Sequence, residues 1–182
     1  MSKSALVLID IQNDYFPGGK WELHKIEDSA ANARRLLDQA RDKGELVVHV
    51  RHEFTGENAP FFEAGSPGAD FHPSMQPAEG EPTVLKHHVN SFRETNLKQL
   101  LDDNGVTNVT IAGDMSHMCI DAAARAAADF GYAVTVVEDA CSSRDLEFNG
   151  DTIPADSIHK AYMSALGFAY ATVLTTDAYL AA

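Results

Sequence analysis

The feature that most constrains the fold is an alternation of short, apolar segments rich in β-branched residues with longer segments of helical spacing. The apolar segments are 5–9, 46–50, 83–85, 109–112, 133–137 and 171–174. Uninterrupted apolar runs of this length are typical of strands buried on both faces of a parallel sheet. Helices are expected at about 29–43, 96–103, 121–130 and 155–166, with a short one at the end of the chain. The pattern predicts a doubly wound, mostly parallel α/β sheet of about six strands.

Composition narrows the class of protein. The chain has 182 residues, of which 45% are hydrophobic and 23% charged, and these values predict a single soluble domain over 1–182. The net charge of −13 disfavours nucleic acid and anionic membrane surfaces as partners. The sequence contains no apolar run near the ~18 residues of a membrane span and no signal-peptide pattern. We therefore expect a cytoplasmic protein without a membrane or nucleic-acid partner.

Two connecting segments are too long for plain turns. Residues 54–82 contain five of the seven prolines, and a loop of this length usually serves a function or packs over the domain as a lid. Residues 139–154 form a second predicted loop, between the fifth strand and the following helix.

Cys119 lies where a nucleophile is expected. The segment Gly113–Ile120 follows a predicted strand and leads into an alanine-rich helix, so Cys119 falls in or near the first turn of that helix. The helix dipole and the free N–H groups there favour the thiolate form. The alternative is a small buried hydrophobic residue. Cys141 is the other cysteine, and we expect it to be buried; no C-x-x-C pair indicates a redox protein.

Two charged residues lie at the ends of strands of the same predicted sheet. Asp10 follows the first strand and Lys86 follows the third, while Cys119 comes after the fourth. The carboxyl ends of parallel strands meet at one edge of the sheet, where ligands bind. A carboxylate that takes the thiol proton, an ammonium that stabilises the charges and N–H groups that hold an oxyanion together favour covalent acyl chemistry.

Three motifs resemble those of the isochorismatase-like cysteine hydrolases. Asp10–Phe16 looks like their D-x-Q-N-D-F opening, and Lys86–Phe92 resembles their K-x-x-x-S-x-F segment, with Asn90 at the usual Ser or Asp position. Gly113–Cys119 resembles their G-x-x-T-x-x-C motif, with Ser116 in place of Thr. The order and spacing of the motifs match over the whole chain.

This resemblance implies a Rossmann-like three-layer sandwich and a catalytic triad of Asp10, Lys86 and Cys119. It also implies a non-proline cis peptide bond between Asp114 and Met115, with the N–H groups of Met115 and Cys119 as the oxyanion hole. Members of the family are commonly dimers or larger homo-oligomers, so we expect one here. The family contains amidases, nicotinamidases and isochorismatases, so the motifs define the chemistry better than the substrate.

The metal pair of nicotinamidases is missing from this sequence. Those enzymes carry an Asp-x-His pair just after the second strand, and the matching positions here are His52 and Phe54. We therefore expect neither a metal nor another cofactor. His52 ends the second strand, so its side chain is predicted to face the substrate pocket.

Further substrate-binding residues are expected from two sources. The resemblance implies that Phe16 and Phe92 line the pocket, although both could be ordinary core residues. The loop 142–150 begins at the same sheet edge, and Glu147 and Phe148 on it are candidates for choosing the substrate. The alternative for this loop is a contact between subunits.

These observations predict that the protein is a metal-independent cysteine amidohydrolase that acts on a small amide or lactam through a thioester. The alternative within the family is hydrolysis of a vinyl ether, which needs no thiol nucleophile. An inactive binding module would be expected to lack a member of the triad, and all three residues are present.

Overall fold

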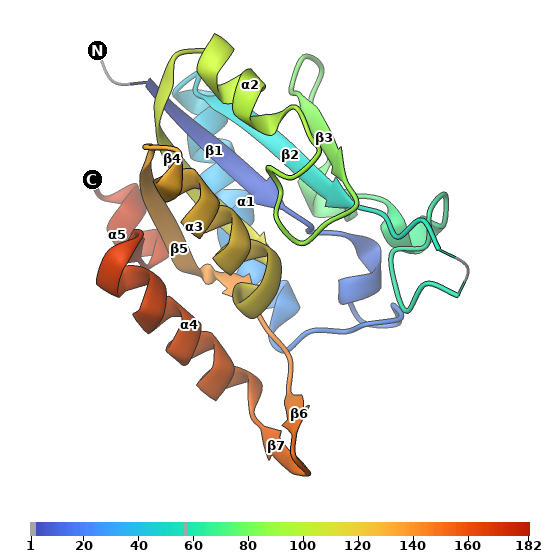
Figure 1. The fold of residues 1–182 in the computed structure, drawn as a ribbon. Coiled ribbons are helices and arrows are strands. Elements are labelled where there is room, and N and C mark those ends of the chain that lie inside the picture. Colours follow the sequence, from blue (N-terminus) through green and yellow to red (C-terminus); the bar gives the residue numbers. More distant parts are fainter. Residues whose placement is uncertain (1–2, 57) are drawn as a thin grey trace.

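The computed structural model describes residues 3–56 and 58–182 and is built on one six-stranded sheet (Figure 1). All paired strands of this sheet run parallel, in the order β3-β2-β1-β4-β5-β8. The strands are β1 (Lys3–Ile9), β2 (Leu46–His52), β3 (Thr83–Lys86), β4 (Val106–Asp114), β5 (Ala133–Ser142) and β8 (Thr172–Leu174). The predicted α/β class and parallel sheet are confirmed.

Helices cover both faces of the sheet and complete the three layers. The helices are α1 (Ile26–Asp42), α2 (Leu97–Asp103), α3 (Asp121–Asp129), α4 (Ala155–Ala169) and α5 (Thr176–Leu180). Apolar side chains of α2, α3 and α4 form one core cluster with one face of the strands. Those of α1 form a second cluster on the other face, with α5 packed at its margin. None of the described helices has the length and apolar character needed to cross a membrane.

The predicted loop at 139–154 contains regular structure instead. β5 continues to Ser142, and a two-stranded antiparallel hairpin follows, with β6 (Leu146–Phe148) paired to β7 (Asp151–Ile153). Asn149 and Gly150 form its turn with φ of 52° and 87°. Both angles suit the tight turn that an Asn-Gly pair favours, which is the sequence signal for this hairpin. The hairpin extends away from the sheet and helices (Figure 1).

The long segment after β2 packs against the body of the protein. It contains short 3₁₀ turns at Pro67–Ala69 and Pro73–Met75, and Phe62 and Met75 are buried in the core cluster on the α1 face. The Phe62 N–H donates to Oδ2 of Asp14 at 2.6 Å. The segment is therefore fixed beside the carboxyl edge of β1 and β2.

Glu81 fixes the other end of that segment. Its carboxylate pairs with Arg41 of α1 at 2.7 Å and with Nε2 of the buried His49 at 2.8 Å. The hydrogen bonds from Arg41, from the Ala78 N–H and from His49 outweigh the effect of burial and lower the pKa of Glu81 to about 2. His49 thus has a structural role in the core, as its position within the second strand indicates.

Candidate active site

The ends of β1, β3 and β4 bring Asp10, Lys86 and Cys119 into direct proximity. The Lys86 Nζ lies 2.7 Å from Oδ2 of Asp10 and 3.2 Å from Sγ of Cys119. All three side chains are buried, with relative exposures of 0%, 1% and 5%. A parallel sheet places successive strand ends at one edge, which explains how residues so distant in sequence converge.

Lys86 lies at the centre of the cluster and contacts its other members. Besides Asp10 and Cys119, its ammonium faces Nδ1 of His52 at 3.0 Å and donates to the His88 carbonyl at 3.3 Å. One ligand atom each of Asp10, His52 and Cys119 lies within 4.8 Å of the other two. This would suit a metal ion by composition, but the ammonium already lies among the three atoms and supplies the positive charge.

Burial sets the protonation states of the triad. Desolvation raises the pKa of Asp10, and Lys86 offsets this only in part. Desolvation would lower the pKa of Lys86, but Asp10 and Cys119 outweigh it and the net shift is upward. Burial and the Asp10 charge raise the pKa of Cys119 despite Lys86. The resting cysteine is therefore a thiol, not the thiolate that the helix start indicated, and its attack requires a base.

The backbone around Asp10 is held in an unusual conformation. Asp10 has φ of 55°, in the left-handed region that residues other than glycine rarely adopt. Its N–H donates to the Val50 carbonyl at 2.9 Å. On the neighbouring strand, Gly113 leaves no room for a side chain, because a Cβ there would collide with the Ile9 backbone. Such conformations are common at functional sites.

The nucleophile turn is the segment Ser116–Ile120, a single π-helical turn between β4 and α3. The peptide bond between Asp114 and Met115 is cis, as the family resemblance implies. The N–H groups of Met118 and Ile120 both donate to the Met115 carbonyl, at 3.0 and 3.2 Å. The turn therefore closes around Met115 and orients Cys119 toward the ends of β1 and β3.

The end of β5 supports this turn through Ser142. Oδ1 of Asp114 accepts hydrogen bonds from the N–H and the Oγ of Ser142, at 2.9 and 2.6 Å. Ser116 donates its hydroxyl to the Ser142 carbonyl at 2.9 Å. Burial outweighs the Ser142 hydrogen bonds and raises the pKa of Asp114 to about 7.

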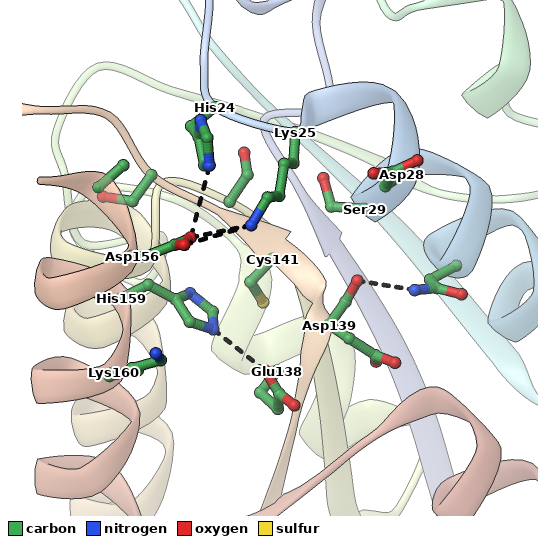
Figure 2. A pocket seen from close by; sticks show the side chains of 14 residues that line it. His24, Lys25, Asp28, Ser29, Glu138, Asp139, Cys141, Asp156, His159 and Lys160 are labelled. Atoms are coloured by element: carbon green, nitrogen blue, oxygen red, sulfur yellow. Dashed lines mark hydrogen bonds and ion pairs between the residues drawn. The ribbon is translucent and has the colours of Figure 1, made fainter.

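A separate polar cavity of about 380 Å³ lies beside the nucleophile turn, between α1, α4 and the end of β5 (Figure 2). Its lining contains none of the three triad residues. His159 points into it and pairs with Glu138 at 3.1 Å, while its Nδ1 lies 2.7 Å from Oγ of Ser116. Asp156 pairs with Lys25 at 3.2 Å, and both residues line the cavity. His159 had no predicted role, because its contact with Ser116 joins positions 43 residues apart and no local motif marks it.

His52 and Gln12 complete the surroundings of the triad. His52 is buried, and its ring lies 4.5 Å from that of Phe54. Gln12 donates to the His52 carbonyl at 2.9 Å and to the Ala69 carbonyl at 2.7 Å, and it accepts from the His52 N–H at 2.8 Å. Gln12 thereby fixes the end of β2 to the long loop, a role that its motif alone does not reveal.

The two predicted pocket residues from the family motifs, Phe16 and Phe92, pack against other aromatic rings. The Phe16 ring stacks on that of His72, with ring centroids 3.6 Å apart. The Phe92 ring packs on Phe130 at 5.3 Å and on Tyr132 at 6.5 Å. Both rings thus have neighbours outside the triad.

The two predicted specificity residues lie on the hairpin. Glu147 accepts a hydrogen bond from Oγ1 of Thr152 at 2.6 Å, across the two strands. Phe148 is 66% exposed. No contact in the described part of the chain ties either side chain to the triad.

Comparison with known proteins identifies the family. The family model of the isochorismatase domain matches residues 4–178. The isochorismatase family protein YddQ of Bacillus subtilis (strain 168) is 46% identical over 177 residues, which cover 97% of this chain and 98% of YddQ. The maleamate amidohydrolase of Pseudomonas putida is 31% identical over 156 residues, covering 78% of this chain and 73% of that protein.

A solved structure extends the likeness to the whole fold. The crystal structure of an isochorismatase hydrolase from Oleispira antarctica superposes with a TM-score of 0.96 and 53% sequence identity. The match covers 100% of this chain and 97% of that one. The chain belongs to the isochorismatase family of hydrolases.

Proposed function

We propose that this protein is a cysteine-dependent amidohydrolase that cleaves a C–N bond in a small amide or lactam through a thioester. The observation that carries the proposal is the position of the Lys86 ammonium, which contacts both Asp10 and Cys119 inside the protein. A nucleophile, a base and a charge partner brought together at one site are the minimum set for nucleophilic acyl transfer.

Acylation begins with proton transfer. Asp10 takes the thiol proton as Sγ of Cys119 attacks the carbonyl carbon, so the thiolate forms only as it is consumed. The N–H groups of Met115 and Cys119 hold the developing oxyanion. Lys86 remains an ammonium and balances the negative charge that moves from Asp10 to the substrate. The C–N bond then breaks, Asp10 returns the proton to the nitrogen, and ammonia or an amine leaves.

Deacylation repeats the sequence with water as the nucleophile. Asp10, again a carboxylate, takes a proton from water as the oxygen attacks the thioester carbonyl. The C–S bond breaks, the proton passes from Asp10 to Sγ, and the carboxylic acid product leaves. Every proton moves through Asp10, so its raised pKa suits a group that must both accept and donate near neutral pH.

The relatives support amide hydrolysis, because one of them is named as a maleamate amidohydrolase. The Lys86 ammonium takes the place that a cation would have among Asp10, His52 and Cys119, which supports a mechanism without a metal. We further propose a cytoplasmic homodimer or larger homo-oligomer. Glu147 and Phe148 would bind substrate or a second subunit from the projecting hairpin, and Phe16 and Phe92 would line the pocket.

A panel of small amides and lactams tests the proposal. We expect the wild-type protein to release ammonia or amine from at least one of them, and Cys119→Ser and Cys119→Ala to release none. Both variants should keep the native circular dichroism spectrum, since the side chain at 119 changes little in volume. Full activity of Cys119→Ala on a vinyl ether, with no amide cleaved by the wild type, would instead establish the ether hydrolase.

A further inference from the structure

The imidazole of His52 has one nitrogen engaged and one free. Nδ1 lies 3.0 Å from the Lys86 Nζ, at the centre of the triad. Nε2 is buried and has no hydrogen-bond partner among residues 3–56 and 58–182. The residue as a whole is 5% exposed, so bulk water does not compensate this nitrogen. Buried polar atoms without partners are rare, and each one calls for a physical explanation.

The neighbours of His52 determine which nitrogen carries the proton. An ammonium has only donors, so Nδ1 must accept from Lys86 and cannot carry a hydrogen itself. Burial, followed by the charge of Lys86, lowers the pKa of His52 to about 3, so the ring is neutral at physiological pH. A neutral imidazole with an accepting Nδ1 carries its hydrogen on Nε2. The free nitrogen is therefore an N–H donor.

The position of this donor is fixed rather than adjustable. Gln12 binds both the N–H and the carbonyl of His52, which anchors the backbone at the end of β2. The rings of Phe54 and Phe62 lie 4.5 and 6.4 Å from the imidazole, centroid to centroid, and limit its rotation. Phenylalanine rings offer no conventional acceptor, so these neighbours leave the buried donor unpaired.

We propose that the Nε2–H of His52 donates a hydrogen bond to an acceptor atom of the substrate, close to the carbonyl that Cys119 attacks. One ring nitrogen of His52 lies within 4.8 Å of the Cys119 sulfur. Nε2 belongs to the same small ring, so the acceptor is expected to lie a few bonds from the scissile carbon. The inference rests on the proposed amidohydrolase function. It narrows the substrate to small amides that carry a second carbonyl, a carboxylate or an unprotonated ring nitrogen near the amide.

Three probe ligands of equal chain length separate the acceptor from the rest of the molecule. Succinamate carries a carboxylate beyond its amide, succinamide carries a neutral carbonyl, and butyramide carries a methyl group. Binding is measured calorimetrically to Cys119→Ser protein, so that no turnover intervenes. We expect succinamate or succinamide to bind at least about tenfold more tightly than butyramide, because an unmet buried donor is costly.

Two substitutions at His52 then test the donor itself. His52→Asn keeps an oxygen where Nδ1 accepts from Lys86 but removes the distal N–H, and it should abolish the preference over butyramide. His52→Gln places an amide N–H near the position of Nε2 and should restore part of the preference. Iodoacetamide should alkylate Cys119 at similar rates in wild type and His52→Asn, because the contact to Lys86 remains. Each variant is checked for native thermal unfolding.

Three results would overturn the inference. They are equal binding of all three probes, a preference that survives His52→Asn, and a parallel loss of binding for all probes with altered alkylation. The last would assign His52 to positioning Lys86. The proposed function fails by a different result, the absence of a thioester on Cys119 in the wild type, which the binding comparison does not involve.

Discussion

The Lys86 ammonium lies 2.7 Å from Oδ2 of Asp10, and both side chains are completely shielded from solvent. Apart from this ion pair, neither Asp10 oxygen accepts a hydrogen bond from a described residue. Each charge therefore depends on the other, and the carboxylate keeps free lone pairs for a proton. This arrangement couples the stability of the fold to its chemistry.

Replacing Lys86 by methionine should reduce both the stability of the fold and the reactivity of the site. The variant leaves Asp10 as a buried, unpaired carboxylate, and breaking such a pair costs about 3–5 kcal/mol of unfolding free energy. Loss of the ammonium also raises the Cys119 pKa further, so alkylation by iodoacetamide at neutral pH should slow. Lys98→Met is the matched control, since Lys98 pairs with Asp102 on the surface with side-chain exposures of 45% and 47%. Equal effects of the two substitutions would contradict the role of Lys86.

Asp10→Asn tests the base. The amide keeps the shape of the side chain but cannot take the thiol proton, so the rate should fall by about 10²–10⁴. Because the carboxylate must be ionised and burial raises its pKa, wild-type kcat/KM should rise with pH over a range above that of an ordinary aspartate. This rise should be absent in Asp10→Asn. A rate loss below about tenfold would reduce Asp10 to a positioning residue.

Asp114 should make the protein less stable as the pH rises. Its pKa is about 7 in the fold, against 3.8 for an ordinary aspartate, so between these values the folded state holds a proton that the unfolded state releases. The contribution of Asp114 is therefore fully present below about pH 4 and declines by roughly 1.4 kcal/mol per pH unit up to neutrality. Urea unfolding of wild type and Asp114→Asn from pH 5 to 7 measures it. We expect the difference in unfolding free energy between wild type and Asp114→Asn to change with pH. The exposed control variant Asp129→Asn should show the same pH dependence as the wild type.

Substitutions in the projecting hairpin should have one of two measurable effects. If Glu147 and Phe148 meet the substrate, Glu147→Gln and Phe148→Ala will raise KM or alter substrate preference while Cys119 alkylation stays normal. If the hairpin is a subunit contact, the same variants will keep their kinetics and change mass in analytical ultracentrifugation. The exposure of Phe148 fits both readings, and unchanged kinetics with unchanged mass would exclude both.

The sheet could be predicted from the sequence because buried parallel strands carry continuous apolar segments. The same property placed Asp10, Lys86 and Cys119 at one edge, since Asp10 and Lys86 directly follow such segments and Cys119 lies in the turn after the fourth. The turn of the hairpin at 146–153 could also be predicted from the sequence, because Asn149-Gly150 is a strong turn signal. Its two short strands could not, because they have no clear apolar pattern.

Other features of the site depend on contacts that no local pattern encodes. The protonated state of Cys119 follows from complete burial beside Asp10, which outweighs the helix start that suggested a thiolate. The contacts of Ser116 with His159, and of Gln12 with His52 and Ala69, join residues 40 or more positions apart. Only the packed fold reveals them.

The most direct test of the central claim is intact-protein mass spectrometry of the wild-type enzyme, quenched in acid during turnover of an amide that releases ammonia. The account predicts an increase in mass equal to the acyl group, located on Cys119 by peptide mapping and removed by hydroxylamine. Cys119→Ser should show no such adduct. Turnover of that amide with no adduct under any quench time, together with activity that persists in Cys119→Ala, would contradict the covalent mechanism.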